Sequence, residues 1–180
     1  MKLVKTEIEG VFIIRKIHIE DERGSFNKIY NEEFFTENEL CSDFKESYYS
    51  VSHKNVIRGM HFYIPTCHHE KLINVIRGKI IDVILDLRKE SLTYGKYISI
   101  ELSEKDHYSL YIPKGCAHGY KSMEDDTTVV YNATKCYDSN CDFGISWNSF
   151  GFDWGIDSPI MSEKDKNLIS FEEFSKINPF

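Results

Sequence analysis

Two segments of the chain concentrate side chains that can move protons. The first is residues 58–65, followed closely by His68-His69-Glu70-Lys71, and the second is residues 112–120. Four of the seven histidines fall in these segments, together with arginine, lysine and tyrosine. Histidine is the side chain whose ordinary pKa lies nearest to neutral pH, and it also binds metal ions. The two segments are therefore the first candidates for a catalytic site.

One interpretation of this cluster is a metal site of the kind found in cupin proteins. Such a site needs three or four histidine or carboxylate ligands that converge on one ion. The possible ligands are His68, His69, Glu70 and His118. The spacing Pro113-x-Gly115-x-x-His118 is similar to one cupin metal motif. However, neighbouring residues on a strand point to opposite faces, so the adjacent His68-His69-Glu70 does not match the other motif.

A second interpretation is metal-free proton transfer. This chemistry needs a base, a cation that meets the developing oxyanion, and an acid. The side chains that could fill these roles are Arg58, His61, Lys71, His118 and Tyr131. Removal of a proton beside a carbonyl group needs this set, because the enolate charge must meet preorganised positive charge. A third interpretation, a module that only binds sugar, uses the aromatic residues but has no need of paired histidine and lysine.

The elements that position these groups are predicted to be short strands. Runs rich in β-branched and aromatic residues occur at 11–17, 25–30, 47–52, 72–77, 79–85, 97–102, 108–112 and 127–133. The segment 73–81 predicts a hairpin that turns at Arg77-Gly78. Both histidine-rich segments are expected at strand ends, next to glycine or proline. Many short strands at regular spacing indicate a sandwich or barrel, and we expect an all-β fold, a β-sandwich of jelly-roll type.

Helices are expected only as short pieces in the N-terminal third and near the C-terminus. Asn31 is predicted to cap a short helix that carries acidic residues in its first turn. Capping-box patterns at Ser162-Glu163-Lys164-Asp165 and at Ser170-Phe171-Glu172-Glu173 predict two more.

Length and composition limit the classes of protein to consider. A chain of 180 residues fits one domain spanning residues 1–180, and 41% apolar with 28% charged residues excludes a disordered protein. The net charge of −7 argues against a nucleic-acid partner, since phosphate binding needs concentrated positive charge. No apolar run approaches the roughly 20 residues of a membrane helix, and charged residues interrupt the N-terminus where a signal peptide would be apolar. We therefore expect a cytoplasmic protein with no membrane partner.

The five cysteines are odd in number and scattered, with no CxxC pair. This pattern indicates a reduced compartment rather than a disulfide framework. Cys116, in the second histidine-rich segment, is a possible nucleophile.

Ordered motifs from about residue 10 to residue 166 resemble the dTDP-4-dehydrorhamnose 3,5-epimerase family. They are Asp21-x-Arg23-Gly24-x-Phe26, Ser50-x-Ser52, Val56-Ile57-Arg58-Gly59-Met60-His61, Lys71-Leu72, Gly78-x-x-x-Asp82-Val83, Asp86-Leu87-Arg88-x-x-Ser91-x-Thr93-x-Gly95, Leu102-Ser103, Ile112-Pro113-x-Gly115-x-Ala117-His118-Gly119, Tyr131-x-x-Thr134-x-x-Tyr137, Gly144-Ile145-x-Trp147-Asn148 and Ser162-Glu163-Lys164-Asp165.

The resemblance implies a cupin-like jelly roll, a homodimer, no metal or other cofactor, and epimerisation of a nucleotide-linked 4-keto-6-deoxy sugar at C3, C5 or both. It implies that His61 is the base and that Asp165 orients it. The family's lysine at the position of Lys71 stabilises the enolate, and the tyrosine matching Tyr131 donates a proton from the opposite face of the sugar.

The resemblance also implies a set of substrate-binding residues. Arg58 and His118 match residues that line the sugar site, and Tyr137 matches an aromatic near the nucleotide. Arg23 and Phe26 match a segment that reaches toward the ligand of the neighbouring subunit.

Some positions around the matching catalytic residues depart from the family pattern. Glu46-Ser47-Tyr48 stands where Gln-x-Asn is usual, so Glu46 and Tyr48 are predicted to contact a different substrate. Phe62-Tyr63 replaces Tyr-Gln, His69 replaces Gln, and Asn132 replaces Lys. These changes favour a related epimerase that acts on a GDP-linked 4-keto-6-deoxyheptose for capsule or another surface polysaccharide. The alternative is the dTDP-4-dehydrorhamnose 3,5-epimerase of the rhamnose pathway.

Overall fold

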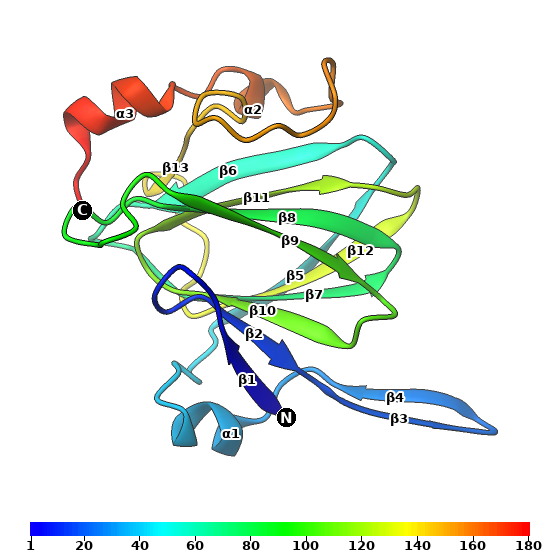
Figure 1. Ribbon diagram of the computed structural model, residues 1–180. Helices are drawn as coiled ribbons and strands as arrows, with labels where there is room; N and C mark the ends of the chain where they lie inside the picture. Colours follow the sequence, from blue (N-terminus) through cyan, green and yellow to red (C-terminus); the bar gives the residue numbers. More distant parts are fainter.

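Two antiparallel sheets pack face to face in the computed structural model, which describes residues 1–180 (Figure 1). The six-stranded sheet has the order β1 (Lys2–Lys5), β2 (Phe12–Arg15), β10 (Tyr108–Ile112), β7 (Lys71–Arg77), β12 (Thr127–Ala133) and β5 (Glu46–Ser52). The five-stranded sheet has the order β13 (Asp142–Gly144), β6 (Ile57–Tyr63), β11 (Cys116–Ser122), β8 (Lys79–Asp86) and β9 (Tyr97–Ser103). The predicted all-β sandwich of jelly-roll type is confirmed.

Three short helices lie outside the sandwich. Asn31 caps α1 (Glu32–Glu37), which packs on the outer face of the six-stranded sheet. The helices α2 (Glu163–Lys166) and α3 (Phe171–Ile177) lie over the five-stranded sheet (Figure 1). Ser170 forms the predicted capping box of α3, and the Ser162 hydroxyl accepts from the backbone N–H of Asp165. The cap at Ser162 thereby fixes the start of the helix that carries Asp165.

The core is divided by the five-stranded sheet. Between the sheets, β-branched side chains such as Ile73 and Ile84 pack together. On the other side of the five-stranded sheet, Trp154 and Phe174 of the C-terminal segment cover a second apolar cluster. Full burial of a side chain of this size stabilises the fold by about 1.5–3 kcal/mol. The C-terminal segment is therefore held on the sheet by its own apolar residues.

The two histidine-rich segments form strands rather than strand ends, so that part of the sequence prediction is wrong. Residues 57–63 form β6 and residues 116–122 form β11, which pair with each other. A Cβ on Gly59 would lie 2.5 Å from the Cα of Gly119, and a Cβ on Gly119 would lie 2.7 Å from the carbonyl oxygen of Arg58. Close approach of the two backbones requires glycine on both strands. Glycine lowers the apparent strand propensity, which hid both strands from the sequence pattern.

The predicted hairpin at Arg77-Gly78 is correct as a turn and wrong as a pairing. The chain reverses at Gly78, whose φ is +75°. However, β7 belongs to the six-stranded sheet and β8 to the five-stranded sheet, so the two strands do not pair. Gly78 therefore carries the chain from one layer of the sandwich to the other.

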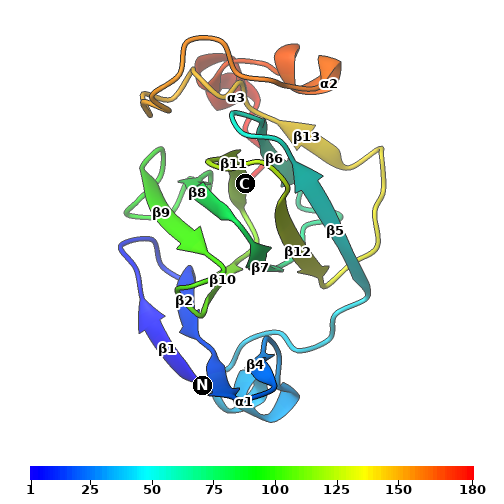
Figure 2. The same cartoon turned by 90° about the vertical axis from the view of Figure 1, so that its right-hand side faces the viewer.

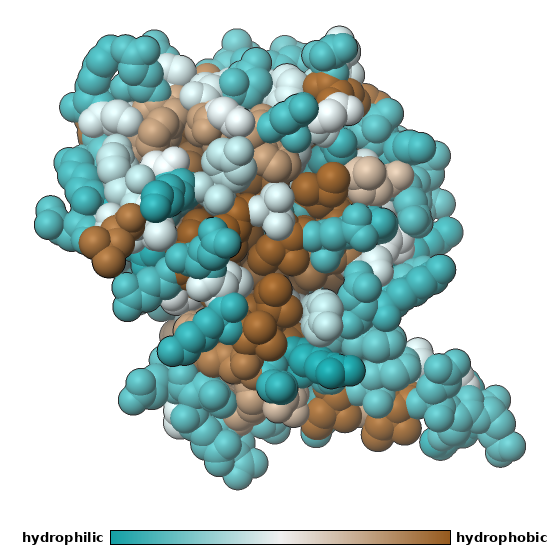
Figure 3. Space-filling model, in the orientation of Figure 1, coloured by the Kyte–Doolittle hydropathy of each residue, from teal (hydrophilic) through white to brown (hydrophobic).

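A two-stranded arm leaves the body of the protein. The strand predicted at 11–17 is split, because Lys16 bonds through its backbone N–H to the carbonyl of His107 and β2 ends there. Strands β3 (Ile17–Asp21) and β4 (Gly24–Lys28) pair only with each other and project from the sandwich (Figure 1). The surface of the arm is hydrophilic at its tip and apolar near its base (Figure 3).

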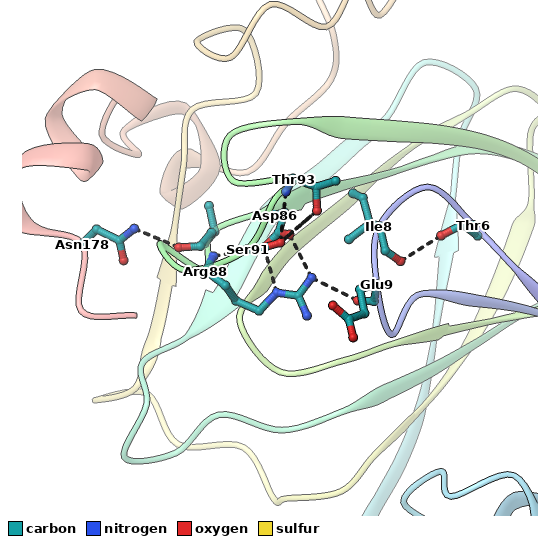
Figure 4. Close-up of polar contacts among 9 residues, drawn as sticks. Thr6, Ile8, Glu9, Asp86, Arg88, Ser91, Thr93 and Asn178 are labelled. Atoms are coloured by element: carbon teal, nitrogen blue, oxygen red, sulfur yellow. Dashed lines mark hydrogen bonds and ion pairs between the residues drawn. The ribbon is translucent and has the colours of Figure 1, made fainter.

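A buried carboxylate ties the loop after β8 to both ends of the chain (Figure 4). Asp86 accepts hydrogen bonds from the Arg88 side chain and from the hydroxyls of Ser91 and Thr93. Arg88 in turn donates to the carbonyl of Glu9, and Asn178 donates to the carbonyl of Leu87. The sequence motif around residues 86–95 therefore fixes the loop after β8 and lines no part of the cavity described below.

The structure contains a disulfide, whereas the cysteine pattern indicated a reduced compartment. Cys67 and Cys141 form a disulfide across 74 residues, and Cys41, Cys116 and Cys136 are free. Burial raises the pKa of the Cys116 thiol to about 12, which disfavours a nucleophilic thiolate there. None of the three helices has the length and apolarity needed to span a bilayer.

Candidate active site

A cavity of about 710 Å³ lies between the two sheets, at the end of the sandwich where inward positions hold polar residues instead of aliphatic ones. Its lining residues come from β5, β7 and β12 of one sheet and from β6 and β11 of the other, and the arrangement of these strands can be followed in Figure 2. Cavities of this size suit small organic ligands. The predicted residues that line it are Tyr48, Arg58, His61, Lys71, His118, Tyr131, Tyr137 and Asp165.

His61 is held between two carboxylates. Its Nε2 lies 2.9 Å from Oδ1 of Asp165, and its Nδ1 lies 3.3 Å from Oδ1 of Asp142. Burial alone would lower the pKa of His61, but hydrogen bonds and charge from Asp142 and Asp165 outweigh it and raise the pKa above its ordinary value. The predicted pairing of His61 with Asp165 is therefore present, and a second carboxylate accompanies it.

Asp142 was missed by the sequence analysis. It is the first residue of β13 and lies opposite Tyr63 of β6. Burial would raise the pKa of Asp142, but hydrogen bonds with His61 and Lys164 hold it at about 2. The available signal was position, since Asp142 stands two residues before the Gly144-Ile145-x-Trp147 motif.

His118 lies directly opposite His61 on the neighbouring strand. Its Nε2 is 3.0 Å from Oδ2 of Asp82, and both side chains are buried. Burial raises the pKa of Asp82, while the charge and hydrogen bond of His118 oppose that rise. His118 is thus fixed in place beneath the cavity by a carboxylate that has no access to solvent.

Lys71 enters the cavity from the opposite sheet. No carboxylate forms an ion pair with it, and its Nζ lies 5.9 Å from the ring centroid of Tyr63. Burial lowers the pKa of Lys71 to about 8, against the charges of Asp142 and Asp82. An unpaired cation in a buried pocket is available to a ligand that brings negative charge.

Tyr131 also belongs to the six-stranded sheet and is paired with Tyr48 of β5. The two rings stack with centroids 4.8 Å apart and planes inclined by 11°. Burial raises the pKa of Tyr131 well above its ordinary value, which keeps its hydroxyl protonated. The donor and the base of the predicted chemistry therefore come from facing layers of the sandwich.

Three predicted binding residues lie outside this cavity. Glu46 lines a smaller neighbouring cavity, where its Oε2 accepts from the backbone N–H of Tyr137. Arg23 and Phe26 are on the projecting arm, and Arg23 pairs with Asp21 of the same arm. Within one chain the arm points away from the body, so these two residues do not reach the site (Figure 1).

The four candidate metal ligands do not converge. His118 is bonded to Asp82, Glu70 to Thr134 and Lys114, and His69 packs edge-on against Tyr63. One group of ligand atoms is close enough together to hold an ion, and it consists of Cys67, Asp138 and Cys141. Its two sulfurs are joined in the disulfide. The arrangement in the cavity suits proton transfer more than metal binding.

Known proteins share both the sequence and the fold. A profile of the dTDP-4-dehydrorhamnose 3,5-epimerase family matches residues 5–173. The dTDP-4-dehydrorhamnose 3,5-epimerase of Methanothermobacter thermautotrophicus is 40% identical over 171 residues, covering 92% of each chain. The crystal structure of the Bacillus anthracis enzyme of that name, with TDP and PPi bound, superposes with a TM-score of 0.91 at 33% identity, covering 94% of this chain and 99% of that chain.

A second structure adds a sugar ligand. The dTDP-6-deoxy-D-glucose-3,5-epimerase of Legionella pneumophila, in complex with dTDP-4-keto-L-rhamnose, superposes with a TM-score of 0.91 at 28% identity, covering 99% of this chain and 97% of that chain. Profile, sequence identity and fold agree over nearly the whole length of the chain. The chain belongs to the dTDP-4-dehydrorhamnose 3,5-epimerase family and is an isomerase of nucleotide-linked sugars.

Proposed function

We propose that the protein is a dTDP-4-dehydrorhamnose 3,5-epimerase of the rhamnose pathway, acting as a single cytoplasmic domain of residues 1–180. The relatives named above carry this activity in their names, and two solved structures hold thymidine nucleotides. None of these relatives names a guanosine-linked heptose, the substrate favoured by the sequence departures. The thymidine-linked substrate of the rhamnose pathway therefore has better support than the GDP-linked heptose.

The proposed chemistry follows from the ketone at C4. Because C3 and C5 both flank this carbonyl, one base and one oxyanion site can act at either carbon. Asp165 and Asp142 hold the His61 ring at Nε2 and Nδ1, and the neutral form of this imidazole is the proposed base. The Lys71 ammonium meets the enolate oxygen, and Tyr131 returns a proton from the other side. Arg58, His118, Tyr48 and Tyr137 surround the sugar and its phosphates, with Glu46 farther along toward the nucleotide.

One observation carries this proposal: His61 lies on one sheet while Lys71 and Tyr131 lie on the facing sheet, with the cavity between them. Inversion needs a base and a donor on opposite faces of the sugar ring, and two facing sheets supply them.

The test is NMR of dTDP-4-keto-6-deoxy-D-glucose with the enzyme in D₂O. We expect deuterium at C3 and C5 together with inverted product. The matched variant Tyr131→Phe should keep exchange and lose inversion by about 10²-fold or more. A parallel sample of a GDP-linked 4-keto-6-deoxyheptose completes the design. Turnover of that sugar alone would overturn the thymidine-linked substrate.

We also propose a homodimer in which the arm completes the partner's site. Ile19 and Phe26 are 55% and 56% exposed on this projecting arm, which suits burial against a second copy. Light scattering should give twice the chain mass. Replacing Ile19 and Phe26 with serine should shift the protein toward monomer, and a monomeric wild-type protein would contradict this assignment.

A further inference from the structure

Three side chains that can bind a metal ion meet outside the cavity. The sulfurs of Cys67 and Cys141 and a carboxylate oxygen of Asp138 all lie within 4.8 Å of one another. Cys141 is buried, Cys67 is half-buried and Asp138 is exposed. None of the three lines the cavity that holds His61. The group is therefore separate from the proposed proton-transfer chemistry and open to solvent on one side.

Two tight turns hold these three residues in place. The backbone N–H of Cys67 donates to the carbonyl of Ile64 at 2.9 Å, and the N–H of Cys141 donates to the carbonyl of Asp138 at 3.1 Å. The N–H of Ile64 donates to the carbonyl of Cys141 at 3.3 Å, which joins one turn to the other. The Cα atoms of the two cysteines are 6.1 Å apart. Backbone hydrogen bonds therefore keep the two thiols close together even when no bond joins the sulfurs.

The carboxylate of Asp138 is oriented toward the sulfurs. Its Oδ1 accepts from the backbone N–H of Asn140 at 2.9 Å and from the side-chain amide of Asn140 at 3.1 Å. Its Oδ2 lies 3.7 Å from Sγ of Cys141. In tetrahedral zinc sites with ordinary bond lengths, a sulfur and an oxygen ligand are about 3.6 Å apart. Hydrogen bonds such as those from Asn140 commonly fix a ligating carboxylate, so Asp138 offers one oxygen at the right separation.

The charges nearby are compatible with a divalent cation. Two thiolates and one carboxylate carry one negative charge more than zinc neutralises. Lys135 donates from Nζ to the carbonyl of Thr66 at 3.4 Å, next to Cys67, and its ammonium offsets this remaining charge. Thiolate ligands select zinc over magnesium or calcium. Three protein ligands with water in the fourth position is an established zinc arrangement, and the exposed side of this group admits that water.

We propose that Cys67, Asp138 and Cys141 form a zinc site when the two cysteines are reduced, and that oxidation to the disulfide closes it. A dithiol reductant transfers two electrons and two protons to the sulfur–sulfur bond and leaves as a cyclic disulfide. Zinc then displaces the two thiol protons and binds both sulfurs. The two states exclude each other, because each uses the same pair of sulfurs. Either state links the turn after β6 to the turn that leads into Asp142.

The test uses cobalt(II) chloride and zinc chloride as probes. One sample is reduced with dithiothreitol and desalted under nitrogen, and the other is oxidised with oxidised glutathione. The reduced protein should bind one cobalt ion per chain, with a thiolate-to-cobalt band in the near ultraviolet and the visible bands of tetrahedral cobalt. One equivalent of zinc should abolish these bands. The oxidised protein should show neither band. Equal binding by both samples would overturn the inference, as would a reduced protein without the thiolate band.

Two variants and a matched control assign the ligands. Cys67→Ser and Asp138→Asn should each lower the cobalt affinity at least about tenfold, the smaller cost recorded for losing a group that only orients a ligand. Asp138→Asn keeps both thiols, so its disulfide should still form, which separates loss of a ligand from misfolding. Cys136→Ser is the control, because this exposed free cysteine lies on the same segment, with its sulfur 3.9 Å from the carbonyl of Lys45.

Cys136→Ser should bind cobalt as wild type does. Loss of binding in this control, or unchanged affinity in Asp138→Asn, would overturn the assignment of the three ligands. None of these measurements uses a nucleotide sugar. Their outcome is therefore independent of whether the protein acts on the thymidine-linked substrate.

Discussion

Two regions of the molecule hold buried or half-buried carboxylates beside a base, and they are used in different ways. At the end of β8, Asp86 accepts from Arg88, Ser91 and Thr93, and these hydrogen bonds overcome burial to hold its pKa at about 2 (Figure 4). At the cavity, Asp142 and Asp165 share a single histidine whose side chain is 24% exposed.

The difference lies in the partner and in the space beside it. Arg88 is always protonated and the Asp86 cluster lines no part of the cavity that holds His61, so its charges have one arrangement. The pKa of His61 is raised above its ordinary value by Asp142 and Asp165, and the ring borders an opening of about 710 Å³. A carboxylate paired with a permanent cation adds stability, whereas one paired with a titratable base sets the pH at which that base can work.

The largest effect is expected from His61→Asn. The variant keeps a polar side chain between Asp142 and Asp165 but cannot take a proton, so epimerase activity should fall by about 10²–10⁴-fold or more. The free energy of unfolding in urea should fall less than in an Asp86 variant, because Asn can still donate one hydrogen bond and Lys164 still pairs with Asp142. Activity is measured by product formation. If His61→Asn lost as much stability as an Asp86 variant does, the two regions would not differ in the way described.

Asp86→Asn should lower the stability of the fold and leave the activity nearly unchanged. The lowered pKa of Asp86, from an ordinary value near 3.9, corresponds to about 2–3 kcal/mol of stability at neutral pH. Because the folded-state pKa is the lower one, this stability is present above about pH 4 and is lost as pH falls toward 2. Urea unfolding at pH 7 and pH 3 should therefore show a large difference between wild type and variant at pH 7 and a smaller one at pH 3. Activity of the folded variant should stay within about twofold.

Lys71 is a titratable cation of the cavity, unlike Arg88 of the Asp86 cluster, and this difference should appear in the activity at alkaline pH. Its pKa, lowered by burial to about 8, predicts that kcat/KM falls as pH rises through 8, because the neutral amine no longer stabilises the enolate. Lys71→Arg retains its charge, so the remaining activity should lose this alkaline limb. A wild-type profile that stays flat to pH 10 would exclude the ammonium from the rate-determining chemistry.

The smallest effect is expected from Asp142→Asn. Removal of one carboxylate lowers the pKa of His61, since Asp142 helps to raise it. His61 must lose a proton before it can act as a base, so the acid limb of kcat/KM should move to lower pH by about one unit. Glu163→Gln, which changes an exposed carboxylate on the same short helix as Asp165, is the control and should leave the limb in place.

The sequence predicted the residues that line the cavity better than the elements that hold them. His61, Lys71 and Tyr131 could be chosen because their side-chain types suit proton transfer and because the motifs around them resemble one family. The strands containing His61 and His118 were hidden, since glycines needed for close backbone contact weaken the strand pattern. The register that sets these two histidines side by side is a property of pairing between distant segments.

Other failures have the same origin. Nothing near Gly78 indicates that the next strand joins the other sheet, because both outcomes need the same sharp turn. The signal for Asp142 is its position two residues before Gly144, and its contact with His61 follows from the pairing of β13 with β6. The odd number and scatter of the cysteines favoured a reduced compartment over a disulfide framework, whereas the fold brings Cys67 and Cys141 together across 74 residues of sequence.

The proposed base, His61, and the proposed donor, Tyr131, lie on separate sheets, so the two sides of the cavity can change independently of each other. Packed sheets lie about 10 Å apart, close to the thickness of a sugar ring with a side chain on each side. A substitution on β6 alters what happens on one face of the ring, and a substitution on β12 or β5 alters the other, without either strand having to move. Replacements in a single sheet can therefore change the stereochemical outcome. In evolution or in protein engineering, such replacements could convert an enzyme that inverts both C3 and C5 into one that inverts a single carbon.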